Sequence, residues 1–285
     1  MRNGGLAAIG AGGVNGAMDL EAEYNNRARV PGHPAILDGW QRDAAAWRDA
    51  CPRAELGLPY GPGEREKLDL FWPDATATDA PIALFIHGGY WVALGRDWVS
   101  HCARGLNGLG IAVALPSYNL APGVSLHRIV AQMRAATAML YRRHGRPMLA
   151  MGHSAGGQLA ALLLATDWPA LEAGLPDGVV PAALPISGVF ELAPLIPTSI
   201  GSAIRMDAAT ALALSPRFLP SPGRPIHCVV GAEESDEYLR QTRDMAAAWG
   251  GSHEALAGAD HFTVIAPLTD PRSALTLRAK ALACG

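Results

Sequence analysis

Three short motifs in this chain carry residue types that together can attack a carbonyl group. The first is GHSAG at residues 152–156, where a serine stands between two glycines. It follows the apolar run Met148–Met151 and opens a segment of helical character, Ser154–Thr166. In this strand–turn–helix context a Gly-x-Ser-x-Gly motif presents a nucleophilic hydroxyl, because small neighbours permit a sharp and strained turn. We therefore predict that Ser154 is a nucleophile.

The second motif, HGGYW at residues 87–91, directly follows the apolar run Ile82–Ile86. A histidine and two glycines after a buried strand are typical of a loop whose backbone N–H group stabilises an oxyanion during acyl transfer. The N–H group of the residue after the nucleophile is the usual second donor. The predicted oxyanion hole therefore consists of the N–H groups of Gly88 or Gly89 and Ala155.

Two aromatic residues, Tyr90 and Trp91, complete this second motif. Their rings could line the site and stack on an aromatic substrate, and core packing is the alternative explanation for both. We therefore keep them as candidate substrate-binding residues.

The third motif, DHF at residues 260–262, supplies the candidate base, His261. It follows a strand-like segment, His253–Leu256, and in folds with a Gly-x-Ser-x-Gly turn the base is the last of the catalytic residues along the chain. Asp260 is adjacent in sequence and poorly placed to hold the imidazole ring. The competing histidines have simpler explanations in helical segments, in an apolar strand or in the turn itself: His101, His127, His144, His227 and His153.

A carboxylate must orient the imidazole, and the loop GAEESDE at residues 231–237 offers four of them after the apolar run Ile226–Val230. Spacing favours Glu234, three positions after the glycine that ends the run. The later carboxylates suit the first turn of the next helix, where negative charge is favourable. We predict Glu234 as the acid and keep Asp236 as the alternative.

The elements that must position these residues alternate along the chain. Short apolar runs indicate buried strands at Ile82–Ile86, Ile111–Leu115, Met148–Met151, Ala183–Ile186 and Ile226–Val230. Between them lie segments of helical character, Leu126–Arg143, Ser154–Thr166 and Glu237–Trp249. Such alternation predicts an α/β fold with a doubly wound, mostly parallel sheet, and the three motifs in this order indicate the α/β-hydrolase fold.

The remaining segments are expected to complete a single domain over residues 18–285. Pro34–Ala50 has apolar residues at helical spacing, and Lys67–Trp72 alternates as an edge or half-buried strand does. Residues 187–215 break the regular alternation, which predicts a small lid insertion. Residues 1–17 are rich in Gly and Ala but lack the continuous apolar run of a secretory signal, so we expect a disordered extension.

Composition excludes several classes of function. The net charge of −3 and the scattered Lys and Arg residues give no basis for nucleic-acid binding, and no apolar run is long enough to span a membrane. The four cysteines lack CxxC spacing and no HExxH motif occurs, so we expect no disulfide, no metal and no other cofactor. We expect a cytoplasmic protein that acts on a small molecule, and the sequence leaves a homodimer open.

Together, these motifs resemble those of the kynurenine formamidase (arylformamidase) group of α/β-hydrolases, over about residues 18–270. Members of that group carry HGGYW, a GHSAGG turn, an acid loop of the form GxxDSxEF and a terminal DHF. The corresponding segments here are HGGYW at 87–91, GHSAGG at 152–157, GAEESDEYLRQ at 231–241 and DHF at 260–262. Many members have Asp where this chain has Glu234, and a Glu can hold the imidazole from one methylene farther.

The resemblance implies a serine hydrolase with the triad Ser154, Glu234 and His261. Its implied substrate is an acylated aromatic compound, most directly N-formyl-L-kynurenine in tryptophan catabolism. Bacterial members include esterases, so a short-chain carboxylesterase with the same triad is the alternative. A non-catalytic ligand-binding protein of the same fold is a remote alternative, because such proteins usually lose a triad residue and this chain retains all three.

Overall fold

The computed structural model describes residues 18–76 and 79–285, so the extension predicted at residues 1–17 lies outside the described part. One eight-stranded sheet forms its centre, in the order β1-β2-β4-β3-β5-β6-β7-β8. The strands are β1 Arg53–Pro59, β2 Lys67–Trp72, β3 Ile82–Ile86, β4 Ala112–Pro116, β5 Met148–His153, β6 Ala183–Ile186, β7 His227–Gly231 and β8 Ser252–Leu256.

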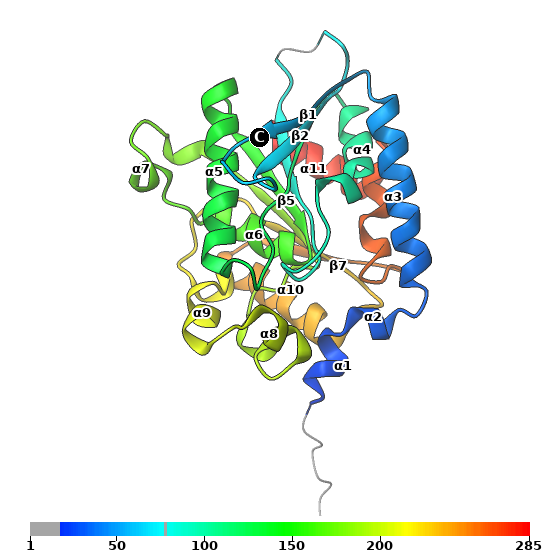
Figure 1. Cartoon of the computed structure of the whole chain (residues 1–285), viewed down its shortest axis with the longest axis vertical. Coiled ribbons are helices and arrows are strands. Elements are labelled where there is room, and N and C mark those ends of the chain that lie inside the picture. The colour runs from blue at the N-terminus through cyan, green and yellow to red at the C-terminus, as the bar shows by residue number, and fades with distance from the viewer. Residues whose placement is uncertain (1–17, 77–78) are drawn as a thin grey trace, which may run out of the picture.

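Helices cover both faces of this sheet. Figure 1 shows α5 and α6 on one side, and α3 with α4 on the other. The α-helices are α1 Leu20–Tyr24, α2 Asn26–Arg29, α3 His33–Ala50, α4 Arg104–Asn107, α5 Leu126–His144, α6 Ala155–Leu164, α7 Trp168–Leu171, α8 Ser199–Ile204, α9 Ala208–Ala213, α10 Asp236–Trp249 and α11 Ala274–Cys284. Short 3₁₀ turns are η1 Arg96–Trp98, η2 Ser100–Ala103, η3 Asp177–Val179, η4 Ala193–Leu195, η5 Pro216–Phe218 and η6 Thr263–Thr269.

The sheet is parallel from β4 to β8, whereas β1 and β2 join it antiparallel. Parallel strands covered on both faces are apolar throughout, which is why the strands after β2 could be recognised from short apolar runs. The predicted doubly wound, mostly parallel sheet of the α/β-hydrolase fold is therefore confirmed.

The strand β2 corrects one detail of the sequence analysis. It is not an edge strand, because β1 pairs with its outer side, and it is buried from Leu68 to Trp72. The alternation was misleading because Asp69 is fully buried, where it accepts hydrogen bonds from the Arg96 guanidinium at 2.9 Å and from Gly57 N at 2.7 Å. In the sequence alone, a charged residue that is buried with such partners cannot be distinguished from one that faces solvent.

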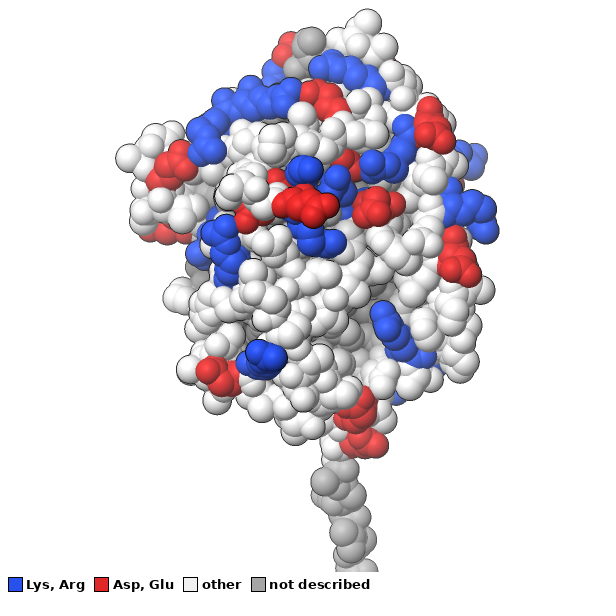
Figure 2. Space-filling model, viewed as in Figure 1, with Lys and Arg blue, Asp and Glu red and all other residues white. Residues whose placement is uncertain are grey.

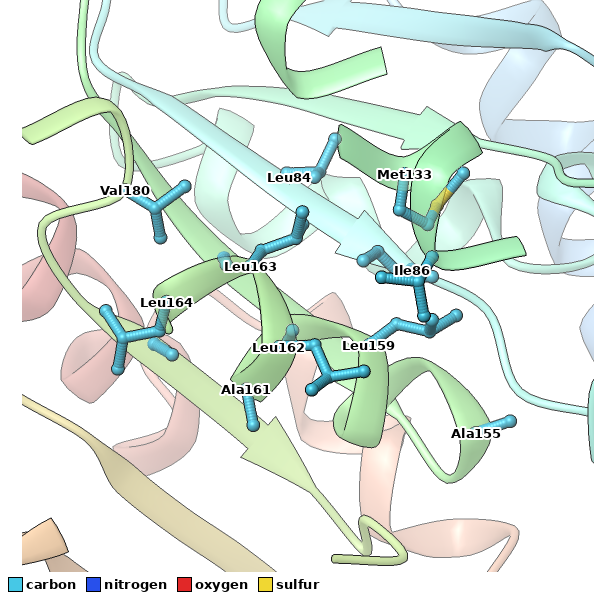
Figure 3. Close-up of a cluster of buried hydrophobic side chains, with 14 of the residues drawn as sticks. Leu84, Ile86, Met133, Ala155, Leu159, Ala161, Leu162, Leu163, Leu164 and Val180 are labelled. Atoms are coloured by element: carbon cyan, nitrogen blue, oxygen red, sulfur yellow. The ribbon is translucent and has the colours of Figure 1, made fainter. Parts of the chain in front are cut away.

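Two apolar cores lie on opposite faces of the sheet, and successive residues of β3 contribute to each in turn. Leu84 and Ile86 pack with α5 and α6, whereas Phe85 points into the core beneath α3 and α11. Figure 3 shows Leu163 and Leu159 of α6 directed toward Leu84 and Ile86. This packing fixes α6 against the strands, and with it the turn that precedes α6.

The segment 187–215 folds into η4, α8 and α9, which lie together at one end of the molecule beside α1 (Figure 1). Glu21 of α1 accepts hydrogen bonds from the backbone N–H and the hydroxyl of Ser199 at 2.8 and 2.7 Å. These bonds tie the segment to the start of the described chain. The lid role of this segment stays a prediction. Within the described residues, none of the helices is both long and apolar enough to cross a membrane.

Candidate active site

The serine of the GHSAG motif lies in a strained turn between β5 and α6. Ser154 has φ 56° and ψ −120°, a conformation that L-residues rarely adopt. Glycine makes the turn possible, because a Cβ atom on Gly156 would lie 2.0 Å from the carbonyl oxygen of Ile86, and one on Gly152 would lie 2.2 Å from that of Gly156. The N–H of Ser154 donates to the carbonyl of Ile186 at 2.8 Å. The turn is thereby fixed to both neighbouring strands.

The imidazole of His261 is hydrogen-bonded to the carboxylate of Glu234, with 2.6 Å between Nδ1 and Oε2. The other carboxylate oxygen accepts from the Ser187 hydroxyl at 2.5 Å and from Gly231 N–H at 2.8 Å. The Glu234 side chain is fully buried, so these donors replace water around its charge. Because Nδ1–H faces a carboxylate, Nε2 is the unprotonated nitrogen in the neutral ring, which is the state that a general base needs.

The other carboxylates near His261 are used differently. Asp236 is exposed in the first turn of α10. Asp260 accepts hydrogen bonds from the backbone N–H groups of Phe262 and Thr263, both at 2.8 Å, and thereby closes a local turn. The predicted residue, Glu234, is thus the one that holds the imidazole, and the alternative Asp236 is not.

His153, to which the sequence analysis gave no role, contacts the same imidazole. Its Nε2 donates to the backbone carbonyl of His261 at 2.8 Å, and the two ring centroids are 4.8 Å apart. Burial lowers the pKa of His153 well below its ordinary value, and the proximity of His261 lowers it further. A neutral His153 can keep this hydrogen bond throughout the working pH range. Its position next to the nucleophile was the only signal that the sequence offered.

The HGGYW loop lies directly against the serine turn, since a Cβ atom on Gly88 would come within 3.0 Å of the Ser154 Cβ. Gly89 has φ 96°, which favours glycine. His87 fixes the loop, because its Nδ1–H donates to the carbonyl of Gly88 at 2.8 Å and its ring stacks on Tyr118 with 4.2 Å between centroids. Burial lowers the pKa of His87 to about 3, so the ring is neutral.

Within the described residues, the backbone N–H groups predicted to form the oxyanion hole donate to no protein acceptor. Ala155 is the first residue of α6, and the N–H groups of a first helical turn have no partner within the helix. In residues 18–76 and 79–285, the N–H groups of Gly88 and Gly89 donate to no backbone carbonyl. Together with the positive end of the α6 dipole, these amides favour a negative charge next to Ser154.

A cavity of about 430 Å³ opens beside Ser154 and His261. Its volume lies within the range of small-molecule sites. The walls come from α2, α3, the HGGYW loop and α8, and their apolar part includes Leu37, Trp40, Ile200 and Phe262. In Figure 2 the surface over α6, α8 and α9 is largely uncharged, whereas charged side chains gather toward the end of the molecule that holds β1 and β2. The site therefore suits a mainly apolar ligand.

The two aromatic residues of the HGGYW loop lie in different environments. Tyr90 lines the cavity, and its hydroxyl donates to the backbone carbonyl of Tyr24 at 2.5 Å. Trp91 is only 1% exposed, belongs to the apolar core and does not line the cavity. The prediction that Trp91 binds substrate is therefore wrong, because removing a whole indole ring from water stabilises the fold more than leaving it at a cavity wall.

A buried hydrogen-bond network connects the N-terminal helices to the site. Tyr238 of α10 packs on the imidazole of His261 with 4.7 Å between centroids, and its hydroxyl lies 2.6 Å from that of Tyr90. Asn26 of α2 donates to Tyr238 at 3.0 Å and to Tyr90 at 3.2 Å. The sequence analysis missed Asn26 and Tyr238, because residues 212 positions apart become neighbours only through packing.

A sheet that carries a strained serine after β5, a buried carboxylate after β7 and its histidine after β8 has the arrangement of α/β hydrolases. The model of a family described as the α/β hydrolase fold matches residues 83–198. The chain is therefore a hydrolase of this class, and the chemistry typical of the class is that of a serine enzyme.

Comparison with known proteins identifies the family within the α/β hydrolases to which the chain belongs. Kynurenine formamidase from Danio rerio is 31% identical over 234 residues, which cover 78% of this chain and 79% of that protein. The Salmo salar enzyme of the same name is 31% identical over 229 residues, or 75% and 77% of the two chains. A crystal structure from Silicibacter sp. TM1040, provisionally named a thioesterase, has a TM-score of 0.85 and 35% identity, and covers 93% of this chain and 100% of that one. The chain belongs to the kynurenine formamidase family.

Proposed function

We propose that this enzyme hydrolyses N-formyl-L-kynurenine to L-kynurenine and formate. The observation that carries the proposal is the relationship to the Danio rerio protein named kynurenine formamidase, which extends over more than three quarters of both chains. The site supports it with a buried Glu234–His261 pair and a cavity that begins at Ser154. Its largely apolar walls suit the aryl ring of such a substrate.

In the first half of the reaction, Nε2 of His261 accepts the proton of the Ser154 hydroxyl while the serine oxygen attacks the formyl carbon. The carbonyl oxygen becomes an oxyanion, to which the N–H groups of Ala155 and of Gly88 or Gly89 donate. The imidazolium of His261 then gives its proton to the departing arylamine nitrogen, the C–N bond breaks, and Ser154 carries the formyl group as an ester.

In the second half, His261 removes a proton from water, and the hydroxide attacks the formyl ester. Formate leaves, and the proton returns to the Ser154 oxygen, so the enzyme is regenerated without net proton change in the protein. The carboxylate of Glu234 holds the imidazole tautomer and stabilises the imidazolium in both halves. Removal of one oxyanion donor typically costs about 10²–10³ in rate, which sets the scale of what the loop contributes.

The test compares kcat/KM of the purified enzyme on N-formyl-L-kynurenine, p-nitrophenyl acetate and p-nitrophenyl butyrate, with Ser154→Ala as the blank. We expect the formamide to be the preferred substrate, with release of equal amounts of kynurenine and formate. Rapid ester cleavage without formamide turnover would contradict the proposal and identify a carboxylesterase.

The esterase alternative has its own support, since the 35% identical Silicibacter protein carries a thioesterase name. Thioesters, esters and formamides share the same acyl-transfer steps and the same groups around Ser154. An active triad is therefore expected for both functions. The comparison of kcat/KM on the p-nitrophenyl esters and on the formamide decides between them, because these substrates differ in acyl group and leaving group.

We also propose a cytoplasmic location and a lid role for residues 187–215. The location is supported by four cysteines that are all free, Cys51, Cys102, Cys228 and Cys284. The lid role is supported by α8, because Ser199 and Ile200 form part of the cavity wall. A homodimer and the lack of nucleic-acid partners remain proposals from the sequence. Light scattering of the purified protein tests the first, and a mobility-shift assay with DNA and RNA tests the second.

A further inference from the structure

One cavity-lining residue is not explained by the acyl-transfer steps. Arg27 of α2 is the only Lys, Arg, Asp or Glu side chain among the described residues that line the cavity beside Ser154. It forms no salt bridge within the described part of the chain, in contrast to its neighbour Arg29, which lies 4.0 Å from Glu23. A guanidinium without a protein counter-charge therefore stands at the wall of a largely apolar cavity.

The backbone that carries Arg27 is held firmly in place. The preceding residue, Asn26, is only 4% exposed and donates to the hydroxyls of Tyr90 and Tyr238. Asn25, before it, caps α2 and donates from Nδ2 to Glu21 at 3.0 Å. The first anchor reaches Tyr90 of the cavity wall, and the second reaches Glu21, which in turn accepts a hydrogen bond from Ser199 of the cavity wall. The geometry thus directs the Arg27 side chain to the cavity, while its guanidinium stays free to bind a ligand.

A free guanidinium suits a particular ligand chemistry. Its planar array of N–H groups binds a carboxylate through two parallel charge-assisted hydrogen bonds, and because Arg27 is exposed, such a pair stays partly hydrated. In the proposed reaction the formyl group lies at Ser154 and His261, and a formyl group carries no further substituent. A carboxylate bound by Arg27 then belongs to the leaving group of the substrate and lies away from the scissile bond.

We propose that Arg27 binds the carboxylate of the leaving group and makes the enzyme selective for aryl formamides that carry an amino-acid side chain. This inference rests on the proposed function, in which the leaving group is an arylamine, and it assigns the residue that distinguishes an anionic substrate from a neutral one. N-formyl-L-kynurenine has the required form, because its formamide and its carboxylate are joined through an aromatic ring and a short chain.

The binding test uses Ser154→Ala, in which no turnover interferes. Calorimetry gives Kd for N-formyl-L-kynurenine and for 2-formamidoacetophenone, which keeps the aryl ketone and the formamide but lacks the amino-acid group. Adding Arg27→Gln should raise Kd for the carboxylate compound about tenfold, the scale of one partly solvated charge-assisted pair, and leave Kd for the neutral compound within about twofold. With Arg27→Lys, Kd for the carboxylate compound should lie between the values for Arg27 and for Arg27→Gln, because lysine keeps the charge without the planar guanidinium.

The matched control is Arg42→Gln on α3, whose side chain is 75% exposed and which removes the same charge outside the cavity. It should leave both Kd values unchanged. With Ser154 present, Arg27→Gln should raise KM for N-formyl-L-kynurenine by about tenfold at nearly constant kcat, as loss of uniform binding does.

The outcomes separate this inference from the proposed function. Equal effects of Arg27→Gln on both compounds, an unchanged Kd for the carboxylate compound, or no binding of it by Ser154→Ala would overturn the role of Arg27. If the wild-type enzyme hydrolyses neither formamide while Ser154→Ala binds the carboxylate compound through Arg27, the formamidase proposal fails and carboxylate recognition stands.

Discussion

Replacement of Glu234 by glutamine should disable the enzyme by changing a tautomer and not by unfolding the protein. In the wild type, Oε1 of Glu234 accepts hydrogen bonds from Ser187 and Gly231, and Oε2 accepts from Nδ1–H of His261. In Glu234→Gln, the amide oxygen must face the two donors on the Oε1 side. The amide NH₂ group then faces His261 and donates to Nδ1, so the ring proton moves to Nε2, the atom that must accept the serine proton.

The size of the effect follows from that tautomer change. A carboxylate-to-amide substitution that gives the wrong imidazole tautomer in a serine triad lowers kcat by about 10⁴-fold. This corresponds to about 5.5 kcal/mol in the activation free energy. Substrate contacts are unchanged, so KM should change far less than kcat. Because the amide oxygen in Glu234→Gln still accepts from Ser187 and Gly231, Tm should fall by only a few degrees.

The assay measures kcat and KM on N-formyl-L-kynurenine and on p-nitrophenyl acetate, together with Tm. The matched control is Asp236→Asn, which alters an exposed carboxylate two positions away and should keep kcat within about twofold of wild type. If Glu234→Gln retained kcat within tenfold, or if Asp236→Asn lost as much as Glu234→Gln, the reasoning from hydrogen-bond donors would be refuted.

Three further predictions test the turn, the loop and their packing. Ser154→Gly should abolish turnover yet raise Tm relative to Ser154→Ala, because glycine relieves about 1–2 kcal/mol of backbone strain at φ 56°. Equal Tm values for the two variants would show that the backbone at this residue is not strained. His87 stays neutral down to about pH 3, while its unfolded form takes up a proton near pH 6.5. Lowering the pH from 6.5 to 5 should therefore reduce the free energy of unfolding by about 1.6 kcal/mol. Denaturant titrations at several pH values should show a smaller dependence of the unfolding free energy on pH in His87→Gln. An unchanged pH dependence would refute the conclusion that His87 is buried and neutral. Gly156→Ala should lower the free energy of unfolding by at least about 2 kcal/mol, because the added Cβ would clash with the carbonyl of Ile86. The control Gly178→Ala, with no atom within 4 Å of the added Cβ, should change it by less than about 1 kcal/mol. Equal losses would argue against crowding at the turn.

The residues proposed to attack and to activate were predictable because their chemistry is tied to local sequence. A serine between glycines, after an apolar run and before a helix, can adopt only a few backbone conformations, so Ser154 could be identified from its neighbours. His261 and Glu234 followed from chain order and from their positions after strands. The choice of Glu234 over Asp236 also came from spacing, and the 2.6 Å bond to His261 agrees with it.

Other residues could not be placed from the sequence, because their environment depends on distant segments. Asp69 alternates with apolar residues as a solvent-facing side chain would, yet arginines from α3 and from the segment after the HGGYW loop pair with it in the interior. Trp91 belongs to the same motif as Tyr90, but only the packed structure sends one ring to the core and the other to the cavity.

The fold class, the strands after β2 and the candidate triad could be predicted from the sequence, since periodicity and local turn chemistry act over a few neighbouring residues. The surroundings of these three residues, in contrast, depend on how distant segments pack. Asn26, Arg27 and Tyr238 reach the site from α2 and α10, and no local pattern marks them. The physical reason is that a binding cavity is enclosed by side chains from segments far apart in the chain, whose contacts exist only after the helices have packed onto the sheet.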